Sequence, residues 1–360
     1  MLTEEQVELD HAVRRVLADI ETTGPAPHAW KENATPIDRT AWRSLTAMGL
    51  LGLGVSESQG GGGAGAQEWA LVAERCGAAL TSCPVVPAAV AAATLAAAGI
   101  PGSEQWLASA LEGSRLLMPA WETLPATVVP RRRETTLAFW DGVVDGVLHA
   151  VPFGHEADGL IAFTDRYALS GPQVVLIDLN DRGVTRRTGS GSLDVLEPTC
   201  EIRLDGVPVS EANADAFPAS LVQVLVAAEL VGVGSAALEA TVTYAKQRFQ
   251  FGRAIGSFQA VKHALADHYV ELDAARLLVR DAAVDIDSRA ASAELAARTA
   301  LCAASSAALR AANDGIQFHG GIGFTWEHTA HLYLKHAQSR QLILGSGDDQ
   351  LHALADLILD

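Results

Sequence analysis

The spacing of apolar and polar residues divides the chain into three regions. Over residues 1–115 apolar side chains recur at helical spacing, as at Leu9, Val13 and Leu17, and a capping-type sequence begins at Thr3. Helices are expected there at 42–50 and 68–79. Residues 225–246 are apolar, rich in Ala and Leu and free of proline, which favours a long helix. From about residue 216 we expect helices at 220–248, 258–287, 291–313 and 329–344, and one or two turns at 350–359.

Between these regions the pattern changes to short runs of alternating or β-branched residues. The runs are 136–140, 146–151, 159–164, 174–179 and 199–204, and Asp-Gly pairs at Asp141, Asp145 and Asp205 indicate turns between strands. The sequence therefore predicts an α+β protein of three domains. We expect an N-terminal helical domain (1–115), a middle antiparallel β-barrel or sandwich (116–215) and a C-terminal helical bundle (216–360).

Composition and charge exclude several classes of protein. Of the 360 residues 49% are hydrophobic and 19% charged, which is too apolar for a disordered chain. The formal net charge of −17 argues against affinity for nucleic acid or anionic lipid. The longest uncharged run, 81–103, is interrupted by prolines and predicts a buried helix rather than a membrane span. Four scattered cysteines and an acidic start without a signal peptide predict reduced thiols in a cytoplasmic protein.

Residues 244–259 predict two helices broken at a small loop. Gly252 and Gly256 bracket the break, and Ser257 is expected to be the N-cap of the following helix. Arg248 and Arg253 therefore lie where one helix ends and the next begins. A guanidinium beside free backbone N–H groups can bind a phosphate, but an arginine at a helix C-terminus can equally satisfy the last carbonyls.

The order of residues in this segment resembles a known family. The pattern Tyr244-Ala-x-x-Arg-x-x-Phe-Gly-x-x-Ile-x-x-Phe-Gln259, followed by Gln317-Phe-His-Gly-Gly-Ile-Gly-Phe-Thr-x-Glu327, is similar to the C-terminal domain of acyl-CoA dehydrogenases. The stretch Val55-Ser-Glu-Ser-Gln-Gly-Gly61 resembles a segment of their N-terminal domain. The resemblance implies FAD-dependent α,β-dehydrogenation of an acyl-CoA and a four-helix C-terminal bundle. It also implies residues that reach the FAD of a neighbouring subunit, namely Arg248, Gln250, Phe251, Gln259, Gln317, Gly320 and Gly321.

The catalytic base of the family is missing. The family places a glutamate before a Gly-Thr or Gly-Ser near the end of the chain, where this sequence has Leu344, or 26 residues before the motif arginine, where it has Val222. An apolar side chain cannot accept a proton. The flavin-contacting motifs of the middle domain are also lost, at 119–125 and 149–153. Glu229, two helical turns beyond Val222, could serve as a displaced base or pair with a neighbouring helix; the acids at 348–349 could fold back or lie at a solvated helix N-terminus.

These losses lead to four hypotheses. The first is a base-lacking subunit that completes the FAD site of a catalytic paralogue in a heterotetramer, of the kind that dehydrogenates fatty or steroid-derived acyl-CoA and passes electrons to an electron-transferring flavoprotein. The second is a self-sufficient homotetramer that uses Glu229. The third is a flavin-dependent monooxygenase of the same fold, which needs no base. The fourth is a structural paralogue without flavin.

Three further sequence patterns give weaker evidence for a ligand site. The sequence 60–65 satisfies G-x-G-x-x-G, but no acidic residue follows at the distance that a dinucleotide fold requires, so a loop is expected. His328, His331 and His336, with Glu327, suggest a metal, although no fixed third and fourth ligands follow from the spacing. The three arginines at 131–133 are expected to be a solvated loop.

Overall fold

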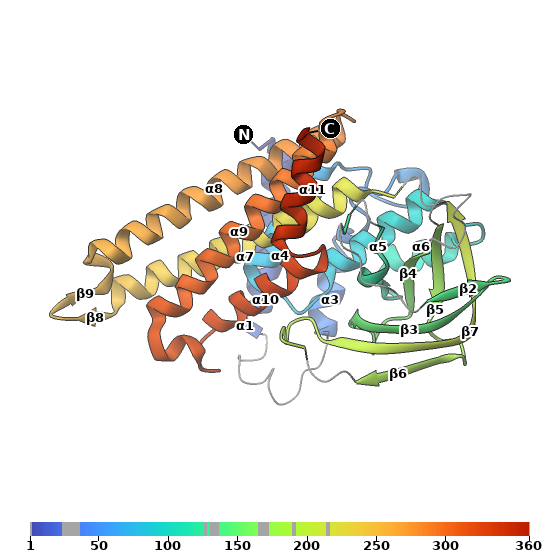
Figure 1. The fold of residues 1–360 in the computed structure, drawn as a ribbon, viewed down its shortest axis with the longest axis horizontal. Helices are drawn as coiled ribbons and strands as arrows, with labels where there is room; N and C mark the ends of the chain where they lie inside the picture. Colours follow the sequence, from blue (N-terminus) through green and yellow to red (C-terminus); the bar gives the residue numbers. More distant parts are fainter. Residues whose placement is uncertain are drawn as a thin grey trace.

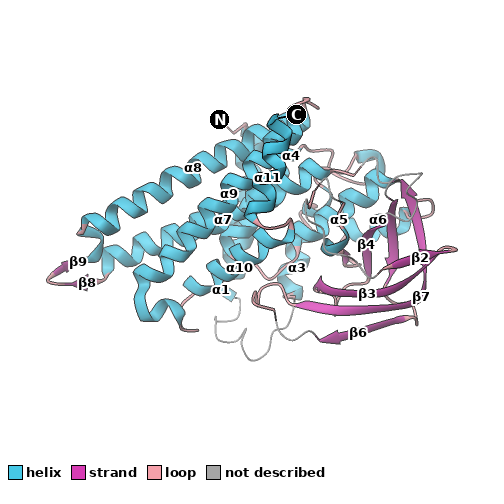
Figure 2. Ribbon diagram, in the orientation of Figure 1, coloured by secondary structure: helices cyan, strands magenta, loops and turns pink. Residues whose placement is uncertain are grey.

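The computed structural model describes residues 2–23, 37–125, 128–129, 137–164, 173–188, 192–213 and 217–359. It confirms the expected order of a helical region, a sheet and a second helical region (Figures 1 and 2). The first region begins with the capping sequence at Thr3, whose hydroxyl accepts from the Gln6 N–H. Its helices are α1 (Glu4–Thr23), α3 (Arg39–Thr46), α4 (Ala66–Ala79), α5 (Val85–Ala98) and α6 (Glu104–Leu111).

The middle region is a single seven-stranded sheet, which does not close into a barrel. The described strands run in the order β1-β4-β5-β7-β3-β2, with β6 beside β7, and β1 pairs with β4 in parallel, so the expectation of a purely antiparallel barrel is wrong. The long strand β7 pairs with β5 on one side and with β3 on the other. Side chains from the two parts of the sheet that β7 joins share one core. The strands are β1 (Leu117–Pro119), β2 (Ala138–Trp140), β3 (Val143–Pro152), β4 (Gly159–Thr164), β5 (Gln173–Asp178), β6 (Val184–Thr188) and β7 (Thr199–Asn213).

Only one of the three Asp-Gly pairs forms a turn. Asp141 and Gly142 join β2 to β3 with φ values of 47° and 74°, as a tight hairpin requires. The pairs at Asp145 and Asp205 lie inside β3 and β7, so those two predictions are wrong. There the Asp145 carboxylate accepts from the Gly206 N–H at 2.9 Å across the irregular part of the ladder. The Asp145 side chain therefore satisfies a backbone N–H group where the pairing of β3 and β7 is irregular. The local sequence cannot distinguish such an irregular strand from a turn.

The C-terminal region packs long helices around α7. Its helices are α7 (Ala219–Gln247), α8 (Gln259–Asp287), α9 (Ala293–His319), α10 (Ala330–Ile343) and α11 (Gly347–Leu359), and α9 runs six residues beyond the predicted end. Helix α7 is apolar and long enough to cross a membrane by length and composition, but 83% of its most apolar window is buried inside the protein. It is therefore the central core helix, and α7, α8 and α9 run side by side in Figure 1. The run 81–103 contains the buried helix α5, as expected.

The N-terminal helices are joined tightly to this bundle. Helix α4 crosses α7 so closely that a Cβ atom on Gly232 would lie 1.9 Å from the carbonyl oxygen of Glu74, and Gly77 is equally restricted. At the other end of α4 the Asp287 carboxylate accepts from the Ala66 N–H at 2.6 Å, which favours the positive end of the helix dipole. These contacts hold the N-terminal helices in place against the C-terminal helical bundle.

All four cysteines lie in the described part of the chain and are free thiols, in agreement with the sequence. Three of them are buried, and burial raises the pKa of the Cys83 thiol to about 12.

Candidate functional site

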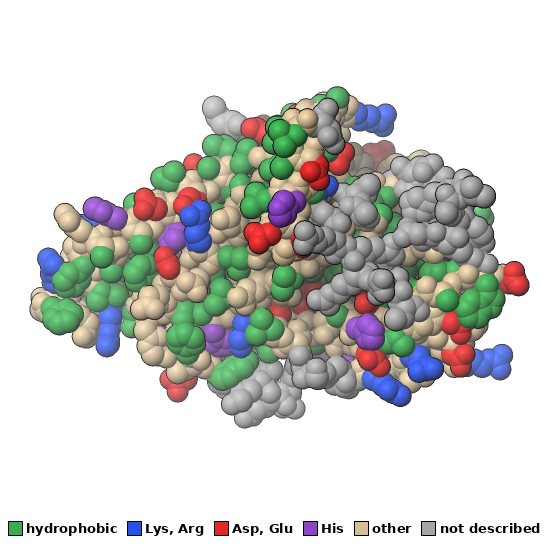
Figure 3. Space-filling model, in the orientation of Figure 1, with side chains coloured by type: hydrophobic (Ala, Val, Ile, Leu, Met, Phe, Trp, Pro, Cys, Tyr) green, Lys and Arg blue, Asp and Glu red, His purple; other side chains and the backbone are tan. Residues whose placement is uncertain are grey.

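A short hairpin projects beyond the end of α7 at one tip of the molecule (Figure 1). Strands β8 (Phe249–Gln250) and β9 (Arg253–Ala254) flank a two-residue turn at Phe251 and Gly252, whose φ values of 53° and 79° suit a tight hairpin. The Phe251 side chain is 92% exposed. Figure 3 shows hydrophobic side chains gathered at this tip beside basic ones. A large exposed aromatic ring on a rigid turn indicates a contact surface.

The two arginines lie at the predicted junction. The backbone N–H of Arg248 donates to Tyr244 and closes α7, while its side chain is exposed and has no ion-pair or hydrogen-bond partner among the described residues. The Arg253 guanidinium lies 3.9 Å above the Phe258 ring. The prediction that Ser257 caps α8 is wrong, because Phe258 is the N-cap residue and the Ser257 hydroxyl donates to the carbonyl of Ala254.

The Gly-Gly motif lies at the same end of the bundle. Helix α9 ends at His319, whose ring stacks on Tyr244 at 4.4 Å between centroids and whose carbonyl accepts from the Tyr244 hydroxyl at 3.3 Å. Gly320 has a φ of 65°, and a Cβ atom on it or on Gly321 would meet no atom within 4 Å. The backbone is therefore open to close approach by another molecule.

The residues that the resemblance assigns to a neighbour's FAD are thus exposed and belong to one tip. Arg248 offers a cation, Phe251 an aromatic face and the Gly320–Gly321 segment bare backbone. Gln259 and Gln317 are exposed as well, at the start of α8 and near the end of α9. This donor set fits a nucleotide cofactor held by a second chain. The assignment of the seven residues to FAD stays a prediction.

The two positions that the resemblance assigns to the family's base lie in the hydrophobic core. Val222 is 1% exposed and Leu344 has no exposed surface, and both belong to the same buried cluster as Trp121, Leu124 and Phe163 from the middle region. A side chain that lined a flavin-sized cavity would keep accessible surface. Val222 and Leu344 keep almost none, so neither side chain lines an open cavity among the described residues.

The segments that replace the lost flavin motifs bind one another instead. The Glu122 carboxylate accepts from the backbone N–H of His149 at 2.7 Å, and the Thr123 hydroxyl accepts from the N–H of Phe163 at 3.0 Å. Gln350 of α11 also donates to the carbonyls of Val128 and Leu344, which ties the C-terminal helix over this core. The Glu122 and Thr123 side chains are therefore engaged within the chain, whereas the buried Trp121 Nε1 has no hydrogen-bond partner among the described residues.

Glu229 pairs with a neighbouring helix, the second of the two alternatives stated for it. Its carboxylate lies 3.0 Å from the Arg340 Nε and 3.3 Å from the His336 Nε2 of α10. His336 also meets the Asp194 carboxylate at 2.6 Å, and Arg340 meets Glu197. All five residues are at most 5% exposed.

Charge pairing decides the protonation of this buried ionic cluster. Burial alone would raise the pKa of Glu229, but Arg340 and His336 outweigh it and lower that pKa. Burial alone would lower the pKa of His336, but Asp194 and Glu229 raise it to about 9. Burial raises the pKa of Glu197. A carboxylate that is ionised and engaged by two cations is poorly suited to abstract a proton from carbon.

The other candidate groups have structural partners. Ser346 and Asp349 form a reciprocal cap at the start of α11: the Ser346 hydroxyl accepts from the Asp349 N–H, and the Asp349 carboxylate accepts from the Ser346 N–H, both at 3.2 Å. Asp348 is exposed in the first turn. Residues 60–65 form a loop preceded by 3₁₀ turns rather than a strand, so the dinucleotide pattern lacks its context. Arg131, Arg132 and Arg133 lie outside the described residues.

The three histidines point to different neighbours. His336 belongs to the buried ionic cluster, His331 packs edge-on against Trp326 at 4.7 Å, and His328 lies 4.3 Å from the His319 ring. Burial first, then nearby positive groups, lowers the pKa of both His328 and His331. Across the described residues no group of three or more metal-ligating side chains was found.

The buried ionic cluster was not anticipated from the sequence. Its only local signal is Glu229, an acid within an otherwise uncharged run of α7, which indicates a buried partner. The partners come from 107 and 142 residues away along the chain, measured from Glu229 to His336 and from Asp194 to His336.

Comparisons with known proteins agree over most of the chain. Residues 3–114 match the family described as "Acyl-CoA dehydrogenase, N-terminal domain" and residues 222–359 match "Acyl-CoA dehydrogenase, C-terminal domain". The chain is 34% identical to Acyl-CoA dehydrogenase IpdE2 of Mycobacterium tuberculosis over 319 residues, which cover 88% of this chain and 86% of that one. It is 32% identical to FadE27 of the same organism over 338 residues, with 88% and 87% covered.

Two solved structures share the fold over nearly the whole length. A Tcur3481–Tcur3483 steroid ACAD variant superposes with a TM-score of 0.88 at 29% identity, and 99% of this chain and 98% of that chain are covered. The ChsE4–ChsE5 complex from Mycobacterium tuberculosis superposes with a TM-score of 0.87 at 27% identity, and 100% and 98% are covered. Each of the two titles joins two names, and the second calls the pair a complex.

Proposed function

The chain belongs to the acyl-CoA dehydrogenase family of FAD enzymes, and we propose that it is the subunit of a heteromer that lacks a base and completes the FAD site of a catalytic partner. The family membership confirms the resemblance carried by the two motifs. One observation supports the finer role most directly. The two positions that the resemblance assigns to the base, Val222 and Leu344, carry buried apolar side chains. The residues that it assigns to the neighbour's FAD are exposed at the tip.

In this proposal the residues of the tip bind and orient while the partner performs the proton abstraction. FAD, when bound in the partner, accepts hydride from the β-carbon of an acyl-CoA. The Arg248 guanidinium would bind an anionic part of the cofactor, and Phe251 would pack on a flat ring. Gly320 and Gly321 would let backbone approach the nucleotide closely. Together these contacts would exclude water from one side of the partner's site.

The alternatives fit the geometry less well. A self-sufficient dehydrogenase would need Glu229 to leave Arg340 and His336, and so to leave two buried cations without their shared partner. A monooxygenase would need a flavin pocket within this chain, at the place where Trp121 and Leu344 share a closed core. A subunit without any flavin contact would have no use for an exposed Phe251 beside a free Arg248.

The names of similar proteins suggest the substrate class of the complex. One superposed structure is titled a steroid ACAD and the other a complex of two chains. We therefore propose a steroid-derived acyl-CoA as substrate, a paralogous dehydrogenase subunit with a glutamate base as partner, and an electron-transferring flavoprotein as acceptor. We further propose that the protein acts in the cytoplasm.

The visible spectrum and FAD content of the purified protein test this role. The chain expressed alone should be colourless, and co-expression with the base-containing paralogue should give a yellow complex with one FAD per two chains. In that complex Arg248→Met should weaken FAD retention by about 10- to 100-fold, since a charge-assisted hydrogen bond contributes about 1.5–3 kcal/mol. The control Arg310→Met removes an exposed arginine paired with Glu271 and should retain FAD. A yellow lone chain whose flavin is bleached by an acyl-CoA would refute the proposal.

A further inference from the structure

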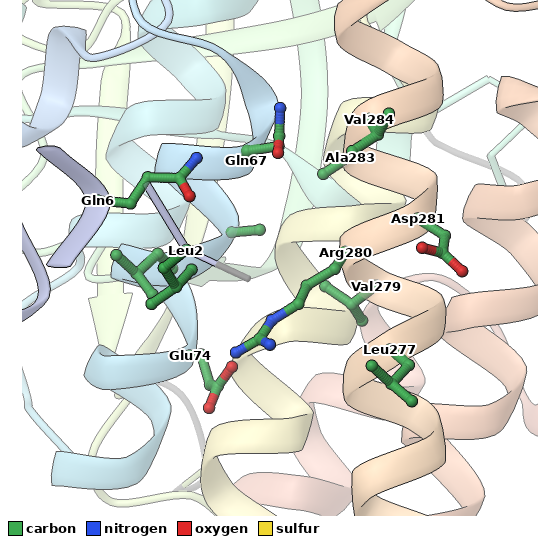
Figure 4. Close-up of a pocket in the computed structure, with 12 residues that line it drawn as sticks. Leu2, Gln6, Gln67, Glu74, Leu277, Val279, Arg280, Asp281, Ala283 and Val284 are labelled. Carbon is green, nitrogen blue, oxygen red and sulfur yellow. The ribbon is translucent and has the colours of Figure 1, made fainter. Parts of the chain in front are cut away.

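A groove between the N-terminal helices and the bundle is walled mainly by apolar side chains (Figure 4). It lies between α1 and α4 on one side and α8 on the other, and its volume is about 230 Å³. Leu2, Leu71 and Leu277 supply apolar surface, while Ala70 and Ala283 are small and buried and so leave room between the helices. Since a cavity of about 150 Å³ holds one benzene molecule, a groove of this volume admits by proportion about nine non-hydrogen atoms.

Arg280 brings a positive charge into these apolar surroundings. Its side chain projects from α8 toward Leu2 in Figure 4, and its guanidinium has no ion-pair or hydrogen-bond partner among the described residues. The residue is partly buried, so the guanidinium has lost part of its hydration without gaining an anion in return. Such a cation favours a ligand that carries a negative charge.

The acids nearest to Arg280 do not supply that charge. The Glu74 carboxylate lies 3.3 Å from a guanidinium nitrogen of Arg75 and 3.0 Å from one of Arg276, so it is engaged by two other arginines. Asp281 follows Arg280 in the chain, but it is exposed to solvent and projects away from Glu74 in Figure 4. The charge of Arg280 is therefore available to a molecule that enters the groove.

We propose that the groove binds a small carboxylate with an apolar body, of about nine non-hydrogen atoms in all. A carboxylate matches the planar fork of the guanidinium, and an aliphatic body would lie against Leu2, Leu71 and Leu277. An inorganic anion would leave these walls in contact with water, and an apolar molecule would leave Arg280 unpaired. The bound carboxylate would join α1 and α4 to α8, because the groove takes its walls from all three helices.

This site is separate from the FAD-completing tip. Arg280 lies 21 residues beyond Gln259 on α8, which is about 30 Å along the helix at 1.5 Å per residue. The proposal therefore does not depend on the role proposed for the tip.

Isothermal titration calorimetry of the full chain with heptanoate, a carboxylate of this size, tests the site. Heptanoate should bind with one molecule per chain and a Kd at or below about 1 mM, and at ten times Kd it should raise the melting temperature by about 3 °C. Heptan-1-ol lacks the charge and inorganic phosphate lacks the apolar body, so each should bind at least about 10-fold more weakly. A chain that neither binds heptanoate nor melts higher at about 10 mM, or that binds phosphate as tightly, would overturn the proposal.

Substitutions locate the bound molecule. Arg280→Met removes the charge but keeps an unbranched apolar side chain, and it should raise the Kd of heptanoate about 10- to 100-fold. Arg203→Met, at an exposed arginine of β7, is the matched control and should bind as the wild type does. Unchanged affinity in Arg280→Met, or an equal loss in Arg203→Met, would contradict the site.

A carboxylate supplied by the chain itself gives an independent test. Leu2→Glu would place an acid in the groove with Arg280 and should abolish heptanoate binding, whereas Leu2→Gln, which has the same size without the charge, should retain it. Equal losses in these two variants would count against a carboxylate bound by Arg280. None of these measurements requires flavin or the paralogue, so the result is independent of the outcome at the tip.

Discussion

Replacing Arg340 by methionine tests whether the buried ionic cluster is structural. The guanidinium lies between Glu197 and Glu229, at a position 4% exposed, and methionine fills similar apolar volume without the charge. Three acids and two cations form the cluster, so its net charge is −1 when all are ionised (2 − 3), and the variant would make it more negative, at −2 (1 − 3). Removing one partner of a buried ion pair costs about 3–5 kcal/mol, and we expect a loss of that size in the free energy of unfolding.

The loss should depend on pH in a definite direction. Without Arg340 the buried carboxylates favour their neutral form, so their pKa values in the folded variant rise above those of the unfolded chain. A group of this kind stabilises the folded state below its unfolded pKa and loses that contribution as pH rises through the folded value. Arg340→Met should therefore be more destabilised at pH 8 than at pH 5.

Urea unfolding followed by circular dichroism and tryptophan fluorescence measures both effects. The matched control is Arg310→Met, which removes an exposed arginine 2.9 Å from Glu271 and should cost less than about 1 kcal/mol. The reasoning is refuted if the two variants lose equal stability, or if the loss in Arg340→Met does not grow between pH 5 and pH 8.

Three more predictions rest on the same packing. Leu344→Glu should cost about 3–5 kcal/mol and yield no dehydrogenase activity in the lone chain, because its site is closed; acyl-CoA-dependent flavin reduction by this variant would contradict the closed core. Gly232→Ala would place a methyl 1.9 Å from the Glu74 carbonyl and should cost about 3 kcal/mol, whereas Gly315→Ala, which meets only a threonine hydroxyl at 3.0 Å, should stay within about 1 kcal/mol of wild type in thermal unfolding. His336, with its pKa raised to about 9, should stabilise the protein fully below about pH 6.5 and lose that contribution as pH rises through 9; His336→Gln should abolish this part of the pH dependence of the melting temperature, and an unchanged profile would count against the charged pair.

Much of the fold could be predicted because local spacing encodes it. The end of α7 at Gln247 and the extent of β4 (Gly159–Thr164) follow from patterns within a few residues of each element. The chemical identity of Val222 and Leu344 alone excludes proton transfer by either side chain, whereas their assignment to the positions of the family's base stays a prediction from the resemblance. The Asp145 and Asp205 pairs were misassigned because a local Asp-Gly signal fits both a turn and an irregular strand, and only the facing strand selects between them.

The sequence by itself determined the helical and β regions, the family motifs and the apolar character of Val222 and Leu344, because each depends on residue type and short-range backbone geometry. Tertiary structure alone decided that Asp194 and Glu229 meet at His336, that the replaced flavin motifs close on one another, and that Tyr244 joins the two motifs at one tip. It also decided that Val270, Leu277 and Val284 of α8 are exposed to solvent. Contacts between residues 27 to 142 positions apart arise from how whole helices and sheets pack, and no local pattern carries that information.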